Sequence, residues 1–174
     1  MTSLRQLTKD DVGSFRRIRL FGLQESPAAF GASVAQEEKI PVDELAKRLE
    51  GTADRWVIGA FSEDALVGVI GFVRDDGEKM RHKGFIWGMY VVPGFRGKGV
   101  GRALFEDALA RIDALPGLLS VRLSVVTSNH LALRLYEKFG FVRYGLETEA
   151  LYASGTFHSE FHMVRRTKKA SNQA

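Results

Sequence analysis

The most constraining feature of this sequence is a glycine-rich turn that joins a strand-like run to a helix-like run. Residues 84–92, GFIWGMYVV, are rich in β-branched and aromatic side chains and end at Pro93, which predicts a strand. Residues 99–114 repeat apolar side chains at four-residue spacing, which predicts an amphipathic helix. Four glycines fall between positions 94 and 101. The chain therefore passes from strand to helix through a backbone of wide conformational freedom.

The other segments predict a sheet of mixed direction. Strand-like runs occupy residues 3–7, 55–62, 65–74, 118–126, 141–152 and 156–166. Helix-like runs occupy residues 8–24, with Thr8 as N-cap, 42–51, ended by Gly51, and 129–139, closed by Gly140. Residues 25–41 form a long connection that allows a helical turn. Antiparallel runs are thus joined to one β-α-β crossover. We expect an α/β (α+β) fold, a mixed and mostly antiparallel sheet flanked by helices, with the crossover carrying the glycine-rich loop.

Length and composition predict one domain at residues 1–166, followed by a flexible basic tail at 167–174. A chain of 174 residues with 45% hydrophobic and 26% charged residues is long enough to bury a core. The net charge of +4 is compatible with an anionic ligand. Much of it lies in the run RRTKK at residues 165–169, which is more typical of a solvated end than of a nucleic-acid site.

Composition also excludes several kinds of site. The chain has no cysteine, which excludes disulfides, thiolate metal sites and a cysteine nucleophile, and we expect no metal. No apolar run approaches the roughly 18 residues of a membrane span, and the first residues lack the apolar stretch of a signal peptide. We therefore expect a cytoplasmic protein without a membrane partner. The aromatic residues are not interleaved with a basic stripe, which argues against a nucleic-acid partner.

The glycine-rich junction has the features of a phosphate or pyrophosphate site. A helix N-terminus presents unpaired N–H groups and the positive end of the helix dipole, and glycines let a bulky anion approach them. Arg96, Lys98 and Arg102 add positive charge. A tight turn with solvated cations is the alternative. Two other phosphate loops fit poorly, because Lys98 is followed by Gly99 rather than Ser or Thr, and because the loop follows antiparallel strands.

Three motifs in this region resemble the GCN5-related N-acetyltransferase (GNAT) family. Residues 96–101, RGKGVG, match the family's Arg/Gln-x-x-Gly-x-Gly/Ala signature. The preceding strand, WGMYVVPGF, and the later segment, SNHLALRLYEKFGF, match the family's strand, its Asn-x-x-Ala-x-x-x-Tyr helix and its Gly-Phe ending. The resemblance is specific over about residues 85–141, and the order of elements extends it across nearly the whole chain.

The resemblance implies that acetyl-coenzyme A (acetyl-CoA) is a co-substrate, and it implies where that molecule binds. The main chain of the strand would hold the pantetheine arm and the loop amides its pyrophosphate. A bulge near Gly88 would splay the strand from the next one. An N–H near Val91 would polarise the thioester carbonyl. The implied cofactor-binding residues are Met89, Tyr90, Val91, Arg96, Gly97, Lys98, Gly99, Val100, Gly101, Arg102, Asn129, Ala132 and Tyr136.

The same resemblance gives Tyr136 a catalytic role, as the general acid that protonates the departing thiolate, and gives Asn129 a hydrogen bond to the cofactor. The two residues are seven positions apart, so they share one helix face, with Ala132 between them. From the residues alone, Asn129 also fits a helix N-cap and Tyr136 also fits a core position.

The general base is left open by the sequence. Many family members carry a glutamate on the strand that here reads HKGFIWGMY, which has no carboxylate. His82, His158, Glu160 and an ordered water are the alternatives. The resemblance implies that the acceptor site is framed by the segment that joins the first two helices and by the last two strands. Its implied substrate-binding residues are Glu25, Phe30, Trp87 and Glu160, with Glu37, Glu38 and Tyr152 nearby.

The function implied is direct transfer of the acetyl group of acetyl-CoA to a primary amine, of a small molecule or a protein, in a ternary complex. The lack of cysteine agrees with a route without an acetyl-cysteine intermediate. The alternatives are a non-catalytic acyl-CoA-binding module, an enzyme with another acyl donor or acceptor atom, and a nucleotide-binding protein. A homodimer formed through the final strands is a further expectation.

Overall fold

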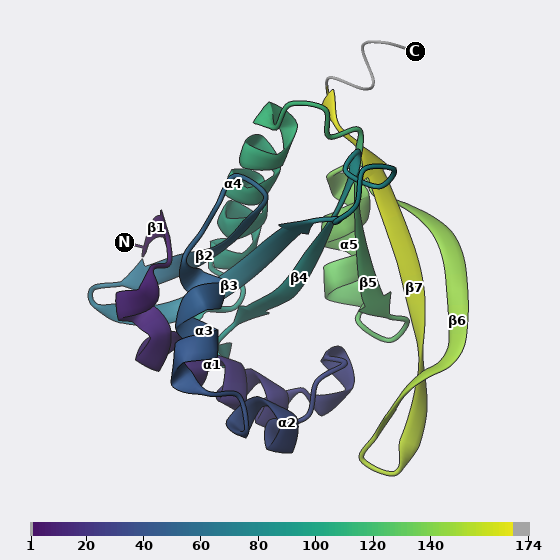
Figure 1. Cartoon of the computed structure of the whole chain (residues 1–174). Helices are drawn as coiled ribbons and strands as arrows, with labels where there is room; N and C mark the ends of the chain where they lie inside the picture. The colour runs from purple at the N-terminus through teal and green to yellow at the C-terminus, as the bar shows by residue number, and fades with distance from the viewer. Residues whose placement is uncertain (1, 169–174) are drawn as a thin grey trace.

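The computed structural model describes residues 2–168 and contains one seven-stranded sheet with helices on both faces (Figure 1). The strands are β1 (Thr2–Gln6), β2 (Arg55–Ser62), β3 (Ala65–Arg74), β4 (Lys83–Val91), β5 (Ser120–Val126), β6 (Val142–Ala153) and β7 (Thr156–Arg166). Their order across the sheet is β1-β2-β3-β4-β5-β7-β6. The helices are α1 (Val12–Glu25), α2 (Val34–Glu38), α3 (Val42–Leu49), α4 (Val100–Ala114) and α5 (His130–Lys138). Short 3-10 turns are η1 (Lys9–Asp11), η2 (Pro27–Ala29) and η3 (Pro93–Phe95).

The expected fold class is confirmed, because the described pairs of neighbouring strands are antiparallel except β4 and β5, which are parallel and joined by α4. The helical turn allowed in the long connection is helix α2, at whose start Ser33 and Gln36 form a reciprocal capping box with the backbone. Within the described chain, no helix combines the length and the apolarity that a membrane span requires.

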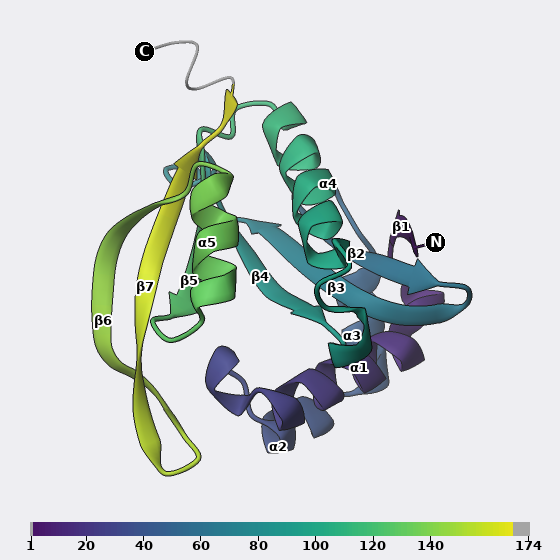
Figure 2. The same ribbon diagram turned by 180° about the vertical axis from the view of Figure 1, so that it is seen from behind.

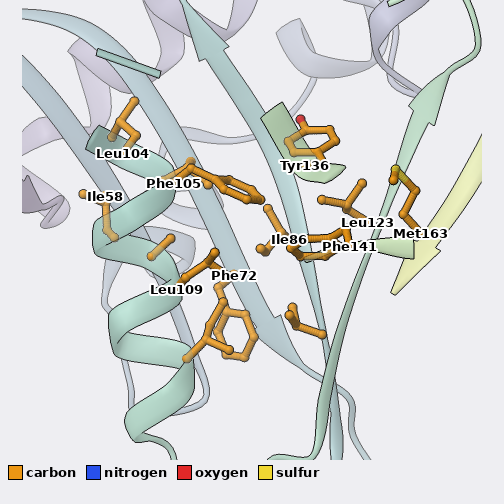
Figure 3. Close-up of a cluster of buried hydrophobic side chains, with 14 of the residues drawn as sticks. Ile58, Phe72, Ile86, Leu104, Phe105, Leu109, Leu123, Tyr136, Phe141 and Met163 are labelled. Atoms are coloured by element: carbon orange, nitrogen blue, oxygen red, sulfur yellow. The ribbon is translucent and has the colours of Figure 1, made fainter. Parts of the chain in front are cut away.

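Each face of the sheet has its own core. Figures 1 and 2 show α4 and α5 on one face and α1 and α3 on the other. Strand β2 is buried on both sides, so its side chains divide between the two cores: Ile58 packs under α4, and Val57 packs under α1 and α3. The larger core joins α4, α5 and the second half of the sheet, and Phe105 and Phe141 are fully buried in it (Figure 3).

Two glycines that follow helices behave differently. Gly140 has φ +85°, the left-handed conformation expected after α5. Gly51 is not among the described glycines with positive φ, and α3 ends two residues earlier, at Leu49. A Cβ at Gly51 would lie 2.0 Å from Nε2 of Gln6. A larger residue at position 51 would therefore require the Gln6 side chain to move.

The C-terminal end of the described chain is held against α4. Arg165 forms a doubly hydrogen-bonded ion pair with Asp113, at 2.9 Å for each bond, and both side chains are only 11% exposed. The hydroxyl of Thr167 donates to the carbonyl of Leu118 at 2.8 Å. Ordered structure therefore includes residues 167 and 168 of the expected tail, and residues 169–174 lie outside the described residues.

Candidate functional site

A bulge in β4 creates the site. Tyr90 pairs with Val69 and Trp87 pairs with Gly71, so Ile70 of β3 faces two residues of β4. Gly88, one of those two, has φ +63°. The distortion expected at Gly88 is present, and it turns the strand where its second half would otherwise continue beside β5.

Beyond this point β4 and β5 separate. They pair only where Lys83, Gly84 and Phe85 face Ser120, Val121 and Arg122. A cavity of about 330 Å³ opens between the diverging strands and is closed by η2, α5 and β7. Its lining includes six residues expected at the site: Phe30, Trp87, Met89, Asn129, Tyr136 and Glu160. Residues from five separate elements therefore meet in one cavity.

The glycine-rich loop is built for an anion. Gly97 and Gly99 have φ +73° and +82°, and a Cβ at either position would meet nothing within 4 Å. Gly99 is the N-cap of α4, so the first amides of a helix of 15 residues follow it directly. Gly101 lies close to β4, where its Cβ would be 3.4 Å from Cε of Met89. Exposed helix amides thus adjoin the free half of β4.

Arg96 does not point freely toward this loop. Its guanidinium donates to Glu25 at 3.0 and 2.7 Å and to the carbonyl of Val91 at 2.8 Å. The hydroxyl of Tyr90 also donates to Glu25, at 3.1 Å. The hydroxyl of Ser26 donates to Glu25 as well, at 2.6 Å. The bonds from Arg96 above all, and then from Ser26, lower the pKa of Glu25 to about 2. Arg96 and Glu25 therefore fasten the loop to the end of α1, and Glu25 does not line the cavity between β4 and β5.

The other cations of the loop remain at the surface. Nζ of Lys98 lies 5.2 Å from the centre of the Phe95 ring. Arg102 pairs with Glu106 at 2.9 Å, one helical turn along α4. Val100 is the first residue of α4 and its side chain is buried, so only its main chain can meet a ligand. The loop therefore offers amides and the charge of Lys98 rather than a cluster of free guanidinium groups.

Tyr136 lies both in the hydrophobic core and at the cavity, the two locations that the sequence allowed. Its ring packs against Phe105, with the ring centres 5.0 Å apart, and Figure 3 shows it within the larger core. Its hydroxyl lies 3.7 Å from Sδ of Met89, and the residue lines the cavity. Burial raises the pKa of Tyr136 to about 12. The hydroxyl is thus a protonated donor at the inner wall of the cavity.

Asn129 likewise combines two features, because it caps α5 and lines the cavity. Its Oδ1 accepts from the amide of Ala132 at 3.1 Å, which makes Asn129 the N-cap of α5. The residue also lines the cavity. Capping uses the oxygen and leaves the NH₂ group as a donor. The N-cap therefore fixes the side chain at the cavity wall.

An arginine that the sequence did not point to supports the aromatic wall. The guanidinium of Arg19 lies 5.9 Å from the ring centre of Trp87 and 5.7 Å from that of Phe30. Arg19 pairs with Glu37 at 3.0 Å, and the two side chains are 10% and 3% exposed. Glu37 is therefore not a free carboxylate for a substrate. The pair fastens α2 to α1 and holds Phe30 and Trp87 at the cavity.

Glu160 brings a carboxylate to the side of the cavity opposite β4. It lies on β7 and lines the cavity, and burial raises its pKa. His82 lies six residues before Gly88, about 20 Å along an extended strand. His158, on β7, is not part of the lining, nor is Tyr152, which packs on Phe157 in the exposed hairpin with ring centres 4.9 Å apart. Glu160 is thus the carboxylate among the expected residues that faces the cavity.

Ser124 is a cavity residue that sequence reasoning missed. It lies on β5 and its hydroxyl is 2.9 Å from Nδ1 of His162 on β7.

Another hollow, of about 640 Å³, lies between α1, the β2–β3 turn and residues 92–94. It contains none of the residues expected to contact a cofactor or an acceptor. The cavity between β4 and β5 is therefore the candidate site.

Known proteins resemble this chain in sequence. A family model described as the acetyltransferase (GNAT) family matches residues 21–141. Spermidine N(1)-acetyltransferase of Vibrio cholerae is 29% identical over 112 residues, which are 64% of this chain and 65% of that protein. Mycothiol acetyltransferase of Renibacterium salmoninarum is 39% identical over 75 residues, which are 42% of this chain and 21% of that protein. The chain thus spans less than two thirds of the length of each of these two relatives.

A solved structure extends the likeness over the whole fold. A protein of Salmonella typhimurium, solved with its cofactor acetyl-CoA, has a TM-score of 0.83 at 17% identity, covering 97% of this chain and 95% of that chain. The matched family region contains the bulged strand, the glycine-rich loop and the helix of Asn129 and Tyr136. This protein therefore belongs to the acetyltransferase (GNAT) family.

Proposed function

We propose that this protein transfers the acetyl group of acetyl-CoA directly to a primary amine, with both substrates bound together. One observation carries the proposal: the cavity between β4 and β5 reaches the free edge of β4, and the N-terminus of α4 adjoins that edge. The amides of residues 97–101 would hold the pyrophosphate. The main chain of Met89, Tyr90 and Val91 would hold the pantetheine arm in the place of a missing strand.

The roles proposed for the side chains differ in kind. Asn129 would donate to the cofactor from its free NH₂ group, beside the small Ala132. Lys98 would contribute charge to the anion site. Arg96 would act through its backbone amide, because its guanidinium is occupied by Glu25. In this proposal Glu25 shapes the loop and does not bind the acceptor.

Tyr136 would assist the departing thiolate mainly by a hydrogen bond. Its pKa is raised to about 12, and an ordinary thiol has a pKa of about 8.5. Complete proton transfer from the phenol to such a thiolate is uphill by about 5 kcal/mol. A hydrogen bond that strengthens as the C–S bond breaks avoids this cost, and burial of the thiolate narrows the difference further.

The acceptor is proposed to be an amine that is cationic in solution. The cavity combines the aromatic wall of Phe30 and Trp87 with the carboxyl group of Glu160, which suits an aliphatic chain that ends in an ammonium group. A spermidine acetyltransferase among the relatives agrees with this class. Small-molecule amines and protein amines both belong to it.

The second candidate function is a non-catalytic acyl-CoA-binding module. It is favoured by the sequence of β4, KGFIWGMYV, which carries no carboxylate to serve as a base. The two functions differ in turnover. An enzyme releases free CoA continuously when amines are supplied, whereas a binding module releases none.

The first experiment measures thermal stability with and without acetyl-CoA. A ligand that binds only the folded protein at about 100 times its Kd adds roughly 2.7 kcal/mol of stability. Lys98→Glu and the double variant Gly99→Glu, Gly101→Glu should lose this shift. Lys79→Glu, the same charge change in an exposed loop before β4, should keep it. No shift in the wild-type protein would refute the cofactor site, and a shift without turnover on any amine would favour the binding module.

We also propose that two copies associate through β6. This strand is the edge of the sheet, and it exposes apolar side chains together with the β6–β7 hairpin. The exposed residues are Val142 (61%), Tyr144 (58%), Leu146 (56%), Tyr152 (67%) and Phe157 (59%). An unprotected apolar edge favours pairing with an identical edge. Sedimentation should show a dimer that Leu146→Lys dissociates, and a wild-type monomer at high concentration would refute the proposal.

A further inference from the structure

Three polar side chains form a hydrogen-bonded chain that begins at the cavity and crosses three strands. The hydroxyl of Ser124, on β5, lies 2.9 Å from Nδ1 of His162, on β7. Nε2 of His162 lies 2.9 Å from a carboxylate oxygen of Glu147, on β6. The register places Ser124 directly opposite His162, and Gly145 of β6 opposite the other side of His162. A serine, an imidazole and a carboxylate are thereby aligned toward the candidate site.

The strand of Glu147 is distorted on both sides of that residue. Its register with β7 shifts between Arg143 and Gly145, and again between Glu147 and Leu151. Glu149, within the second irregularity, has φ +55°. Bulges re-aim side chains and are common beside active sites. Here the two bulges bracket the residue whose carboxylate reaches the imidazole.

The direction of the hydrogen bonds follows from the chemistry of the groups. Glu147 is 54% exposed, and a solvated carboxylate accepts hydrogen bonds but does not donate them. Nε2 of a neutral His162 therefore carries the proton, which leaves Nδ1 as an acceptor. The hydroxyl of Ser124 consequently donates to Nδ1. Its oxygen lone pairs remain available to a proton donor in the cavity.

We propose that Ser124, His162 and Glu147 form a proton relay that takes the proton from the acceptor amine. The inference rests on the proposed acetyl transfer. Ser124 is the catalytic residue of the relay because it alone among the three lines the cavity, and His162 and Glu147 are positioning residues that act through it.

The step balances as follows. The amine nitrogen forms a bond to the acetyl carbon, the C–S bond breaks, and its electron pair leaves with the sulfur. The amine proton moves to the oxygen of Ser124 while the proton of that hydroxyl moves to Nδ1 of His162. The resulting imidazolium keeps its Nε2–H bond to Glu147. His162 is 30% exposed, so water can take the extra proton and restore the neutral imidazole.

Groups from β5, β6 and β7 surround His162. Glu147 faces it from β6, and Glu160 interacts with it electrostatically along β7. Tyr144 lies beside it, with ring centres 6.1 Å apart, and Ser124 faces it from β5. The relay thus supplies a proton acceptor in place of the carboxylate that β4 lacks.

The test compares variants that remove or keep each donor. Ser124→Ala and His162→Gln should each lower kcat by about 10²- to 10³-fold, in the range of general base catalysis. The double variant should be no slower than either single one, because the residues act as a unit. Ser124→Thr keeps the hydroxyl and should recover most of kcat. His82→Gln, at an exposed histidine far from the cavity, is the matched control and should behave as wild type.

Three readouts separate a relay from a structural role. The acid limb of the kcat profile should disappear in Ser124→Ala, because this change interrupts the relay. The thermal shift with acetyl-CoA should be unchanged in all variants. Nitrogen NMR of the resting protein should show Nε2 of His162 protonated and Nδ1 unprotonated. A protonated Nδ1 in the neutral imidazole would overturn the relay whether or not an acceptor has been found.

Other outcomes overturn the proposal in distinguishable ways. Wild-type kcat and pH profile in Ser124→Ala would overturn the relay and leave the acetyl transfer standing, with Glu160 as the remaining carboxyl group at the cavity. Release of one CoA per protein before any amine is added would instead make Ser124 a nucleophile that carries the acetyl group. No CoA release from the wild-type protein with any amine would overturn the proposed function and the relay together.

Discussion

Replacement of Tyr136 by phenylalanine separates the contribution of its ring to the core from the contribution of its hydroxyl at the cavity. The phenyl ring keeps its packing on Phe105 and Phe141. The change removes a hydroxyl that donates to the thioether sulfur of Met89, at 3.7 Å. Loss of so weak a bond, together with the removal of a buried polar group, should leave the free energy of unfolding within about 1 kcal/mol of wild type.

Turnover should respond very differently. A positioned donor to the leaving group contributes about 10²- to 10⁴-fold, which corresponds to about 3–5 kcal/mol of transition-state stabilisation. We therefore expect Tyr136→Phe to lower kcat by that factor, with little change in the KM for acetyl-CoA. The assay is steady-state release of free CoA with an accepted amine, beside urea unfolding of the same variant.

Tyr90 provides a matched comparison. Burial raises its pKa to about 12 as well, but its hydroxyl donates to Glu25 on the α1 side of the sheet. Tyr90→Phe loses a bond to a charged acceptor, so it should lower the free energy of unfolding by about 1–2 kcal/mol and lower kcat less than tenfold. Full kcat in a folded Tyr136→Phe variant would refute the reasoning and leave Tyr136 as a core residue only.

Three further substitutions test features around the site. Gly99→Ala meets no steric contact at φ +82°. It should therefore cost only the left-handed conformation, about 1–2 kcal/mol in urea unfolding, and should raise the KM for acetyl-CoA. Glu25 has a pKa lowered from 4.5 to about 2 by Arg96, so its stabilisation is complete above pH 4.5 and is lost as the pH falls toward 2. Glu25→Gln should flatten stability over this range, and an unchanged pH slope would contradict the pairing. Asp113→Asn leaves Arg165 buried and uncompensated, so it should lower the free energy of unfolding by about 3–5 kcal/mol, and a loss below 1 kcal/mol would show that the pair is solvated.

The order of the elements could be predicted because it depends on local patterns. A run rich in β-branched and aromatic residues that ends at Pro93 marked β4, and apolar residues at four-residue spacing marked α4. The family resemblance, together with a glycine inside the strand, marked the bulge at Gly88. The sequence allowed a helical turn in the long connection but did not place helix α2, because five residues give too short a periodic run, although its capping box could be read from Ser33 and Gln36.

Features that depend on pairing between distant segments could not be predicted. Arg96 and Glu25 are 71 residues apart, and nothing near either residue indicates that their side chains meet. Ser124 and His162 are 38 residues apart and are aligned by the register of β5 and β7, which a shift of one residue would abolish. Family motifs identify loops and helix faces, whereas contacts across the second half of the sheet require the tertiary structure.

The separation of β4 from β5 also has a mechanical consequence. The first four strands and the last three are joined across the sheet by three residue pairs at one end, so they resemble two plates on a hinge. A ligand bound between the strands would contact both parts of the sheet and hold them together. Hydrogen exchange along β4 and β5 should then slow together when the ligand is bound, including at amides far from the reacting atoms.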